Sequence, residues 1–165
     1  MIAFTAFKVV AFLMLFIVIF GFLNYFSSPS KYTTSTKNSF NGLDKREFQN
    51  GTYLGEIVDG VLSGEGEYLS LDGIKYTGSF DNSLEDGYGK CTYPNVGSFE
   101  GEFKNGLRNG KGKFKWSSGE ILDGNWIDDI IQDGTYTFKD GSKYVGKFIS
   151  GDFGDGEYFA KDGTK

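Results

Sequence analysis

The side chains that carry most enzymatic and metal chemistry are scarce in this sequence. Its 165 residues include no histidine and a single cysteine, Cys91. Zinc sites made of cysteine and histidine, Ser-His-Asp triads, Cys-His dyads and disulfide frameworks are therefore excluded. We interpret Cys91 as a small buried thiol, and we predict no catalytic residue, no metal ligand and no cofactor.

Carboxylates are the remaining candidates, because paired carboxylates can hydrolyse glycosides or hold calcium. The chain has neither an Asp-x-Asp-x-Asp-Gly loop nor the nine-residue period of calcium-binding β-rolls. Its aspartates recur instead at regular positions where turns use them for backbone hydrogen bonds. These aspartates are Asp59, Asp72, Asp128, Asp129, Asp133, Asp140, Asp152, Asp155 and Asp162. We therefore expect turn chemistry rather than an acidic site.

One cluster of basic residues could bind a charged ligand. It consists of Lys104, Arg108, Lys111, Lys113 and Lys115. Such a cluster could meet phosphoinositide headgroups or an acidic protein. Alternatively, its lysines are paired on a solvated face, with Glu102 opposite Lys113. Glu100 would then lie opposite Lys115. Residues 53–165 contain 12 basic and 20 acidic side chains, a net charge of −8, which disfavours binding to nucleic acid or anionic lipid by bulk charge.

The N-terminal residues differ sharply from the rest. Residues 9–23 read VVAFLMLFIVIFGFL without a polar side chain, and a stretch rich in Ser, Thr and Asn follows. An apolar run of this length is at the border between a signal-peptide core and a membrane-spanning helix. Because no good small-x-small cleavage site follows, we expect an uncleaved transmembrane anchor over residues 1–26 and a flexible spacer over 27–47. A cleaved signal and a buried core helix are the alternatives. The flanking charges leave open on which side of the membrane the remaining chain lies.

Glycine is the unusual residue of this sequence, with 25 in the whole chain. An aromatic-x-Gly signal such as Tyr53-Leu54-Gly55 recurs at intervals of 23, 23, 23 and 22 residues, with Leu122 in the aromatic position of the fourth unit. A Gly-x-Gly pair and an Asp-Gly turn follow in most units. We assign a structural role to Gly55, Gly78, Gly101, Gly124 and Gly146, and to Gly66, Gly89, Gly112, Gly134 and Gly156. Five units in register predict a repeat architecture, and 18% aromatic residues exclude a disordered chain.

Each unit contains two short stretches in which aromatic and polar residues alternate, separated by glycine-rich turns. We therefore predict one β-hairpin per unit and an all-β fold, an elongated single-layer antiparallel meander. The array would occupy residues 48–165. It would consist of a half unit at 48–52 and units at 53–75, 76–98, 99–121, 122–143 and 144–165.

Aromatic rings placed over glycines would give such a sheet its cohesion, because a ring can then lie flat where the neighbouring strand has no side chain. In the register that we expect, Gly55 faces Tyr68, and the other units follow the same rule. This register sets Cys91 opposite Gly78. The rings would form one apolar stripe along the array.

The succession of Tyr-x-Gly, Gly-x-Gly and Asp-Gly at a 23-residue period resembles the MORN (membrane occupation and recognition nexus) repeat. The resemblance covers residues 53–165, about two-thirds of the chain. It implies a β-hairpin array that serves as an interaction module. For this family, binding to acidic phospholipids and self-association have both been proposed.

From the anchor and the array together we expect a single-pass, membrane-anchored scaffold or protein-interaction module without catalysis. Binding of acidic phospholipid through the lysine cluster is an alternative function. A further alternative is an exported binder of glycans or choline, for which Trp116 and Trp126 would be the available tryptophans. Lys165 stands where a sixth unit would begin, so the last strand could pair with a partner protein or a second copy. We expect no nucleic-acid partner.

Overall fold

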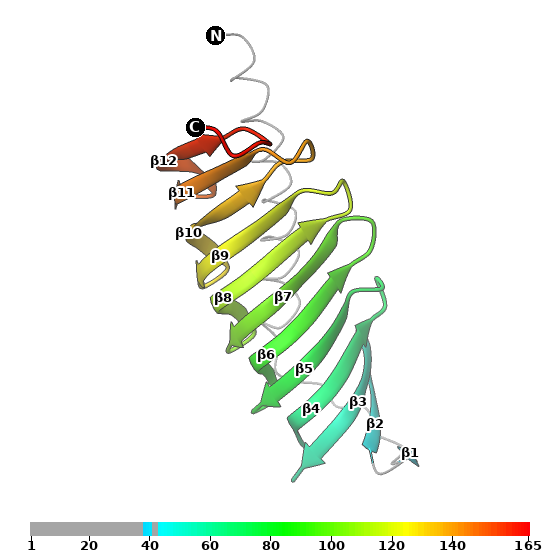
Figure 1. Cartoon of the computed structure of the whole chain (residues 1–165). Helices are drawn as coiled ribbons and strands as arrows, with labels where there is room; N and C mark the ends of the chain where they lie inside the picture. Colours follow the sequence, from blue (N-terminus) through cyan, green and yellow to red (C-terminus); the bar gives the residue numbers. More distant parts are fainter. Residues whose placement is uncertain (1–37, 41–42) are drawn as a thin grey trace.

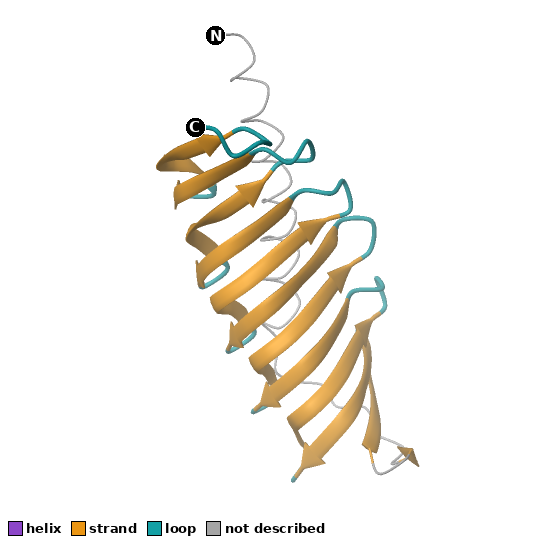
Figure 2. Cartoon of the chain, in the orientation of Figure 1, coloured by secondary structure: helices purple, strands orange, loops and turns teal. Residues whose placement is uncertain are grey.

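The computed structural model describes residues 38–40 and 43–165. Within these residues, twelve strands form one antiparallel sheet in chain order, so that each strand pairs with its neighbours in sequence (Figures 1 and 2). The strands are β1 (Asn38–Phe40), β2 (Leu43–Phe48), β3 (Gly51–Val58), β4 (Val61–Ser70), β5 (Lys75–Asp81), β6 (Leu84–Tyr93), β7 (Gly97–Lys104), β8 (Leu107–Trp116), β9 (Ile121–Ile127), β10 (Ile130–Thr137), β11 (Lys143–Ile149) and β12 (Asp152–Phe159). The predicted all-β, antiparallel meander of hairpins is thus confirmed.

Strands β3 to β12 form five hairpins, one for each predicted unit. The sheet starts earlier than we predicted, because β1 and β2 both begin inside the stretch expected to be a spacer, at Asn38 and Leu43. Asp44 of β2 pairs with Gly55 of β3. The predicted anchor over residues 1–26 lies outside the described residues. In the part of the chain that the structure describes, no helix has the length and apolar character needed to cross a membrane.

Each of the five hairpins closes through a two-residue turn in which both residues have positive φ. The turns are Asp59-Gly60, Asn82-Ser83, Asn105-Gly106, Asp128-Asp129 and Ser150-Gly151. This conformation matches the twist of the flanking strands and favours Asn, Asp and Gly. The second position holds a residue other than glycine in two turns, where Ser83 has a φ of 66° and Asp129 a φ of 68°.

Val96 stands where the other connections between units have a turn glycine. Here Asn95 takes the positive φ, 61°, whereas in the first unit Gly73 takes it, at 82°. The amide of Val96 still donates to the carbonyl of Tyr93, at 3.2 Å. Because the positive φ has moved one residue earlier, valine fits this turn without backbone strain.

The register of the sheet differs from our prediction by two residues. Gly55 faces Gly66 rather than Tyr68, and Tyr68 faces Tyr53. A ladder running straight from the turn would set Gly55 opposite Gly64. A bulge beside Gly55 shifts its partner by two residues, to Gly66. The predicted partner, Tyr68, would have required a shift of four. The expectation for Cys91 was wrong for the same reason, since Cys91 faces Tyr76.

The ten structural glycines face one another in an unbroken line across β3 to β12. In order along the sheet they are Gly55, Gly66, Gly78, Gly89, Gly101, Gly112, Gly124, Gly134, Gly146 and Gly156. We call this the glycine line. It leaves a strip without side chains along the whole array of hairpins.

The positions of Tyr76 and Phe80 show that a strand folds where it crosses the glycine line. They are four residues apart on β5, which in an extended strand separates two side chains by about 13 Å. Their ring centroids are only 5.1 Å apart, with the planes at 84°. The strand therefore folds at Gly78, between them, and the ring of Tyr76 covers both Gly78 and the facing Gly89. Rings do cover glycines, as predicted, but each ring belongs to the aromatic-x-Gly signal of the creased strand itself.

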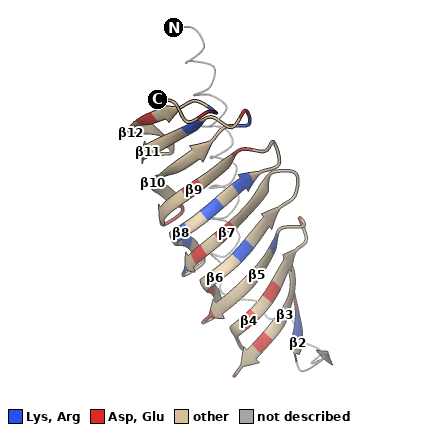
Figure 3. Ribbon diagram, viewed as in Figure 1, with Lys and Arg blue, Asp and Glu red and all other residues tan. Residues whose placement is uncertain are grey.

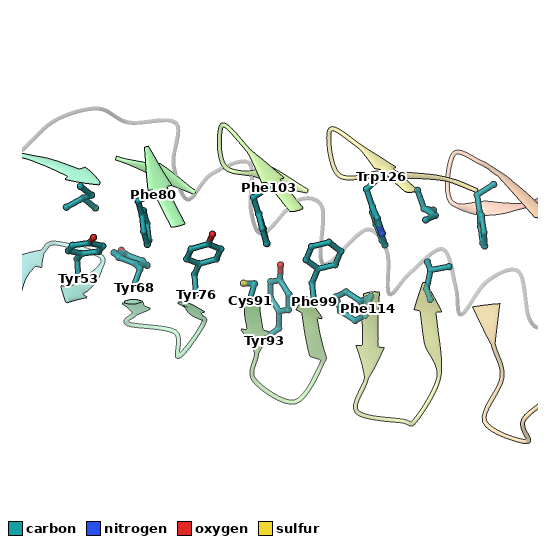
Figure 4. Packing of buried hydrophobic residues seen from close by; sticks show 14 of the residues in the cluster. Tyr53, Tyr68, Tyr76, Phe80, Cys91, Tyr93, Phe99, Phe103, Phe114 and Trp126 are labelled. Carbon is teal, nitrogen blue, oxygen red and sulfur yellow. The ribbon is translucent and has the colours of Figure 1, made fainter. Parts of the chain in front are cut away.

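The creased strands bring their two halves together around a column of rings (Figure 4). Successive rings along this column meet edge to face, with centroids 5.0 to 5.4 Å apart and planes at 82 to 89°. The rings are, in order, Tyr53, Phe80, Tyr76, Phe103, Phe99 and Trp126. Such pairs contribute about 0.5–1.5 kcal/mol each beyond the burial of their area. We call this side of the sheet the inner face and the opposite side the outer face.

A side chain added to the glycine line should destabilise the sheet. A methyl group at Gly112 would fall inside van der Waals distance of the ring of Phe99, which is fully buried. Overpacking of this kind costs about 1–3 kcal/mol. We therefore expect Gly112→Ala to lower the free energy of unfolding by that amount in urea denaturation followed by tryptophan fluorescence. The control is Lys113→Ala on the outer face, expected to change it by less than about 0.5 kcal/mol; equal losses in both variants would contradict the role of the glycine line.

Candidate interaction surfaces

Most side chains of the inner face are buried against one another in the hydrophobic cluster. Trp126 is 1% exposed, and its indole nitrogen donates to the carbonyl of Gly112 at 3.1 Å. This tryptophan is therefore not exposed to a glycan or choline ligand. Cys91 is fully buried, as predicted, and burial raises the pKa of its thiol to about 12. Surfaces that could bind a partner lie mainly on the outer face and at the ends of the hairpins.

The outer face carries charges in neighbouring rows across the strands (Figure 3). Three ion pairs join adjacent strands: Lys75–Glu67 at 2.7 Å, Lys113–Asp123 at 3.0 Å and Lys90–Glu100 at 3.7 Å. Their side chains are about half exposed, so each pair contributes under about 1 kcal/mol. These pairs leave the outer face flat and hydrated.

The structure divides the predicted basic cluster. Lys111, Lys113 and Lys115 alternate with buried residues along β8 and are exposed on the outer face, and Lys104 is exposed at the end of β7. Arg108 does not belong to this group, and its assignment to the cluster was wrong. It faces Phe103 on the inner face and is 2% exposed, because strand alternation sets it on the opposite side from the odd-numbered lysines.

The predicted partners of the lysines were wrong, because the register differs by two residues from the one we expected. Lys113 faces Glu100 rather than Glu102, and Ser98 faces Lys115. Lys113 forms its ion pair with Asp123 of the next strand, and the hydrogen bond to this carboxylate raises the pKa of Lys113. The cluster is therefore partly neutralised, which is the solvated, paired arrangement that we expected as the alternative to a headgroup site.

Arg108 is held on the inner face by Asp129 from the next hairpin turn. Its Nε donates to Asp129 Oδ1 at 2.7 Å, and its Nη2 to the Asp129 carbonyl at 3.2 Å. The guanidinium lies over the Trp126 ring, 4.5 Å from the centroid. The sequence analysis did not predict this pair. Its two residues are 21 positions apart, close to the repeat length, and a search for partners at that spacing could have found it.

Arg108 is one of a series of inner-face residues that follow each turn at 23-residue intervals: Leu62, Glu85, Arg108 and Ile131. The turn of the following unit packs on each of the first three. The amide of Leu62 donates to Ser83 Oγ at 3.0 Å, and the amide of Arg108 donates to Asp129 Oδ1 at 3.0 Å. Ser83 and Asp129 thus hold positive φ because their side chains cap the preceding unit.

Glu85 meets a turn residue without a side chain, Gly106, and fills the space with its own carboxyl group. A Cβ at Gly106 would lie 3.3 Å from Glu85 Oε2. The Glu85 side chain is 1% exposed, and Oε2 has no hydrogen-bond partner. Burial, with a smaller effect from the charge of Asp129, raises the pKa of Glu85 from 4.5 to about 7. The position that holds Leu62 in the first unit and Ile131 in the fourth holds here a carboxyl that resists ionisation.

Glu85 should make stability depend on pH. Its folded-state pKa of about 7 exceeds the unfolded value of 4.5, so its contribution is fully present below pH 4.5 and is lost as the pH rises through 7. The loss amounts to about 3 kcal/mol at pH 8. We expect the difference in unfolding free energy between the wild type and Glu85→Gln to change by this amount between pH 4.5 and 8.

Urea denaturation at each pH measures this difference, and comparing variants cancels the titration of other groups. The matched control is Glu100→Gln, since Glu100 is about half exposed on the outer face. Because an exposed ion pair contributes little, this substitution should change the unfolding free energy by less than about 1 kcal/mol. A pH-independent difference for Glu85→Gln would show that the buried carboxyl does not titrate in this range.

Two of the predicted turn aspartates, Asp140 and Asp162, accept hydrogen bonds within their own turns. Asp140 accepts a hydrogen bond from the amide of Ser142, and Asp162 accepts one from the amide of Thr164, each at 2.9 Å. The hydroxyls of Ser142 and Thr164 also donate to these carboxylates, and these side-chain bonds, together with the amide bonds, lower the pKa of both carboxyls. Among the described residues, no three Asp, Glu, Cys or His side chains are grouped to hold a metal ion. Two hollows of the described surface, one at Ala160–Asp162 and one over β10 to β12, are wide and open to solvent.

Comparison with known families agrees with this architecture. The model of the MORN repeat matches residues 53–75, 76–95, 99–121 and 134–143. The unmatched start of the fourth unit contains Leu122, which occupies the aromatic position and is buried all the same. A search of curated proteins gives no match. With its repeated units, hairpins and glycine line, the chain belongs to the MORN-repeat family.

Proposed function

We propose that this MORN-repeat chain is a membrane-anchored, non-catalytic scaffold that binds protein through its array of hairpins. The observation that carries the proposal is the different use of the two faces. The inner face is filled by the ring column, whereas the outer face of β3 to β12 is left as an extended, regular surface. A surface of this kind suits contact with another macromolecule better than enclosure of a small substrate.

Two further observations support parts of the proposal. The apolar run at residues 9–23 is long enough to contribute most of a membrane span. The hollows over β10 to β12 and at Ala160–Asp162 are open, and catalysis of most reactions needs an enclosed site that excludes water. The proposal therefore places the chain in a membrane as a single-pass protein, with its array as the binding part.

Membrane fractionation tests the anchor, and photo-cross-linking tests the binding surface. The full chain should stay in the membrane pellet after alkaline carbonate extraction, and a variant without residues 1–26 should move to the soluble fraction. A photoreactive residue in place of Thr77, exposed on the outer face of β5, should form protein adducts in intact membranes.

The control position is Tyr76, the buried neighbour of Thr77, whose replacement should yield no adducts beyond the chain itself. Extraction of the full chain by carbonate would contradict the anchor. Adducts that are equal at the two positions would contradict the outer face as the binding surface.

Binding to acidic phospholipid is the second candidate function, and the three exposed lysines of β8 favour it. We propose it as the alternative because Lys111 and Lys115 form no ion pair among the described residues. If it holds, the full chain should bind vesicles containing phosphoinositide through more than its anchor. In that case, Lys111→Glu with Lys115→Glu should weaken recruitment of the array about tenfold in flotation at low salt.

The matched control reverses Lys143 and Lys147, which lie on β11 away from the cluster. An equal effect of the two double variants would indicate bulk charge rather than a lipid site. No effect of either would exclude lipid binding by the array and leave protein binding as the function.

A further inference from the structure

Four aromatic residues lie at the border of the inner face, toward the connections between units, which run along one long side of the sheet (Figure 2). They are Trp116 on β8, Tyr136 on β10, Phe138 directly after β10, and Tyr158 on β12. We call them the aromatic ledge. The first three pack against the buried core but stay partly exposed, and Tyr158 is 44% exposed. Successive rings are in contact, with centroids 4.9 to 6.4 Å apart.

Polar atoms of the ledge are not used within the fold. Elsewhere on the inner face, the hydroxyls of Tyr53, Tyr76 and Tyr144 each donate to a backbone carbonyl of their own strand, at 2.7 to 3.0 Å. The indole nitrogen of Trp116 and the hydroxyl of Tyr136 donate to no acceptor in the part of the chain that the structure describes. Neither atom is among those buried without a partner, so both reach solvent. The ledge therefore offers hydrogen-bond donors beside apolar rings.

Equivalent positions of the ledge recur on every second strand. Trp116 and Phe138 each follow a glycine of the glycine line by four residues, and Tyr136 and Tyr158 each follow one by two. Neighbouring strands are about 4.7–4.9 Å apart, so the members of each pair are about 9.4–9.8 Å apart. A polyproline II helix repeats every three residues, at 3.1 Å per residue, or about 9.3 Å. A proline-rich peptide lying across the strands would therefore turn the same face to successive members of the ledge.

The chemistry of the ledge fits such a peptide as well as its spacing does. A polyproline II helix has no internal hydrogen bonds, so its carbonyls can accept from Trp116 and Tyr136. Proline-rich segments dock on aromatic-lined surfaces, and their preformed helix keeps the entropic cost of binding low. Apolar rings with exposed donors between them are the two features that this mode of recognition uses.

A carboxylate beside the ledge is available for a basic residue of the peptide. Burial, with a smaller effect from the charge of Glu120, raises the pKa of Tyr136 to about 12, which places this carboxylate near the Tyr136 hydroxyl. Glu120 accepts a hydrogen bond from the hydroxyl of Ser118. It forms no ion pair among the described residues, and its charge is therefore free to meet a cationic side chain of another molecule.

We propose that the aromatic ledge binds a proline-rich segment of a partner protein, in the polyproline II conformation, across β8 to β12 and with a basic residue beside Glu120. The inference rests on the proposed function, because it states the chemistry of a protein that the array binds, and it adds a second contact surface to the outer face. The ledge is small, so the complex belongs to the weak, transient class, with a dissociation constant on the order of 100 µM.

A peptide fits the ledge better than a glycan or a lipid surface does. Tyr136 is tilted by 48° from Trp116 and by 66° from Phe138. These rings therefore form a ridged surface rather than the flat platform on which a sugar ring stacks. A lipid surface is disfavoured because Glu120 would be brought close to anionic headgroups. Glycans and vesicles are the competitors that the experiment includes.

Fluorescence anisotropy with the full chain in phosphatidylcholine nanodiscs tests the ledge. The probe is a dye-labelled peptide with one arginine followed by four Pro-Pro-Ala repeats, and the control peptide has glycine and serine in place of the prolines. We expect the proline peptide to bind at least about tenfold more tightly than the control. Chitohexaose and phosphatidylserine vesicles, added as competitors, should not displace it.

Substitutions on the two faces test which rings bind the peptide. Tyr158→Ala removes an exposed ring of the ledge and should weaken binding about tenfold. Tyr136→Phe removes only a hydroxyl that the fold does not use, and the loss of one hydrogen bond should weaken binding about fivefold. The control is Tyr88→Ala, whose ring is more exposed, at 60%, but lies on the outer face. It should leave binding unchanged within about twofold, and the urea midpoints verify that each variant is folded.

The charge contact has a separate test. Glu120→Gln should weaken binding of the arginine peptide about threefold, because an exposed ion pair contributes under about 1 kcal/mol. The same substitution should not change binding of a peptide with alanine in place of the arginine. Equal effects of Glu120→Gln on the two peptides would exclude the basic residue from its position beside Glu120.

The ledge is excluded as a peptide site if the proline and control peptides bind equally, or if Tyr158→Ala and Tyr88→Ala have equal effects. Displacement by chitohexaose would assign the ledge to a glycan, and displacement by vesicles would assign it to lipid. If any of these occurs while the chain stays in the membrane and Thr77 still yields protein adducts, the peptide site fails and the proposed function stands. If the peptide binds as expected while carbonate extracts the full chain, the anchor fails and the peptide site stands.

Discussion

The structure depends on a strip of backbone that has no side chains. A single sheet exposes both faces, so its strands must gain cohesion from something other than a covering layer. Except in the fourth unit, where Leu122 replaces the aromatic residue, the glycine line supplies this by allowing the first strand of each hairpin to fold over its own aromatic ring. That ring covers the glycine of its own strand and the glycine of the next, as Tyr76 covers Gly78 and Gly89. Neighbouring strands are therefore joined by packing as well as by backbone hydrogen bonds.

At the hairpin ends, as along the glycine line, a side chain of one unit fits against a complementary residue of the next. Where the second residue of a turn has a side chain, that side chain caps the unit before it, as Ser83 does for Leu62 and Asp129 for Arg108. Where the turn has Gly106, the preceding Glu85 fills the space. Side chains that look like irregularities of the repeat are thus matched across units. The matching partner is about 21 residues away, which hides it from inspection of any one unit.

Much of this fold could be predicted from the sequence, and the reasons differ from feature to feature. The spacing of the aromatic-x-Gly signals indicated the number of hairpins, because each unit must repeat the same local structure. The register could not be predicted, since a bulge beside Gly55 changes the pairing by two residues and leaves no distinct signal. Arg108 was placed among the exposed lysines for a different reason, because the residues were grouped by closeness in sequence, whereas alternation along β8 sets Arg108 on the other face. The start of β2 was missed because LDKREF is short and highly charged.

The creased sheet also has a mechanical consequence. In an antiparallel ladder the backbone hydrogen bonds are perpendicular to the strands, and here the strands cross the long axis of the array. Tension along that axis loads the ladders one after another, in series, so the weakest junction limits the load that the array can bear. The rings contact the glycines of two adjacent strands, so their packing resists the separation of those strands under tension. At the junction of Glu85 with Gly106 the buried carboxyl has a pKa raised to about 7 by burial, so its ionisation in alkaline conditions weakens one link of that series.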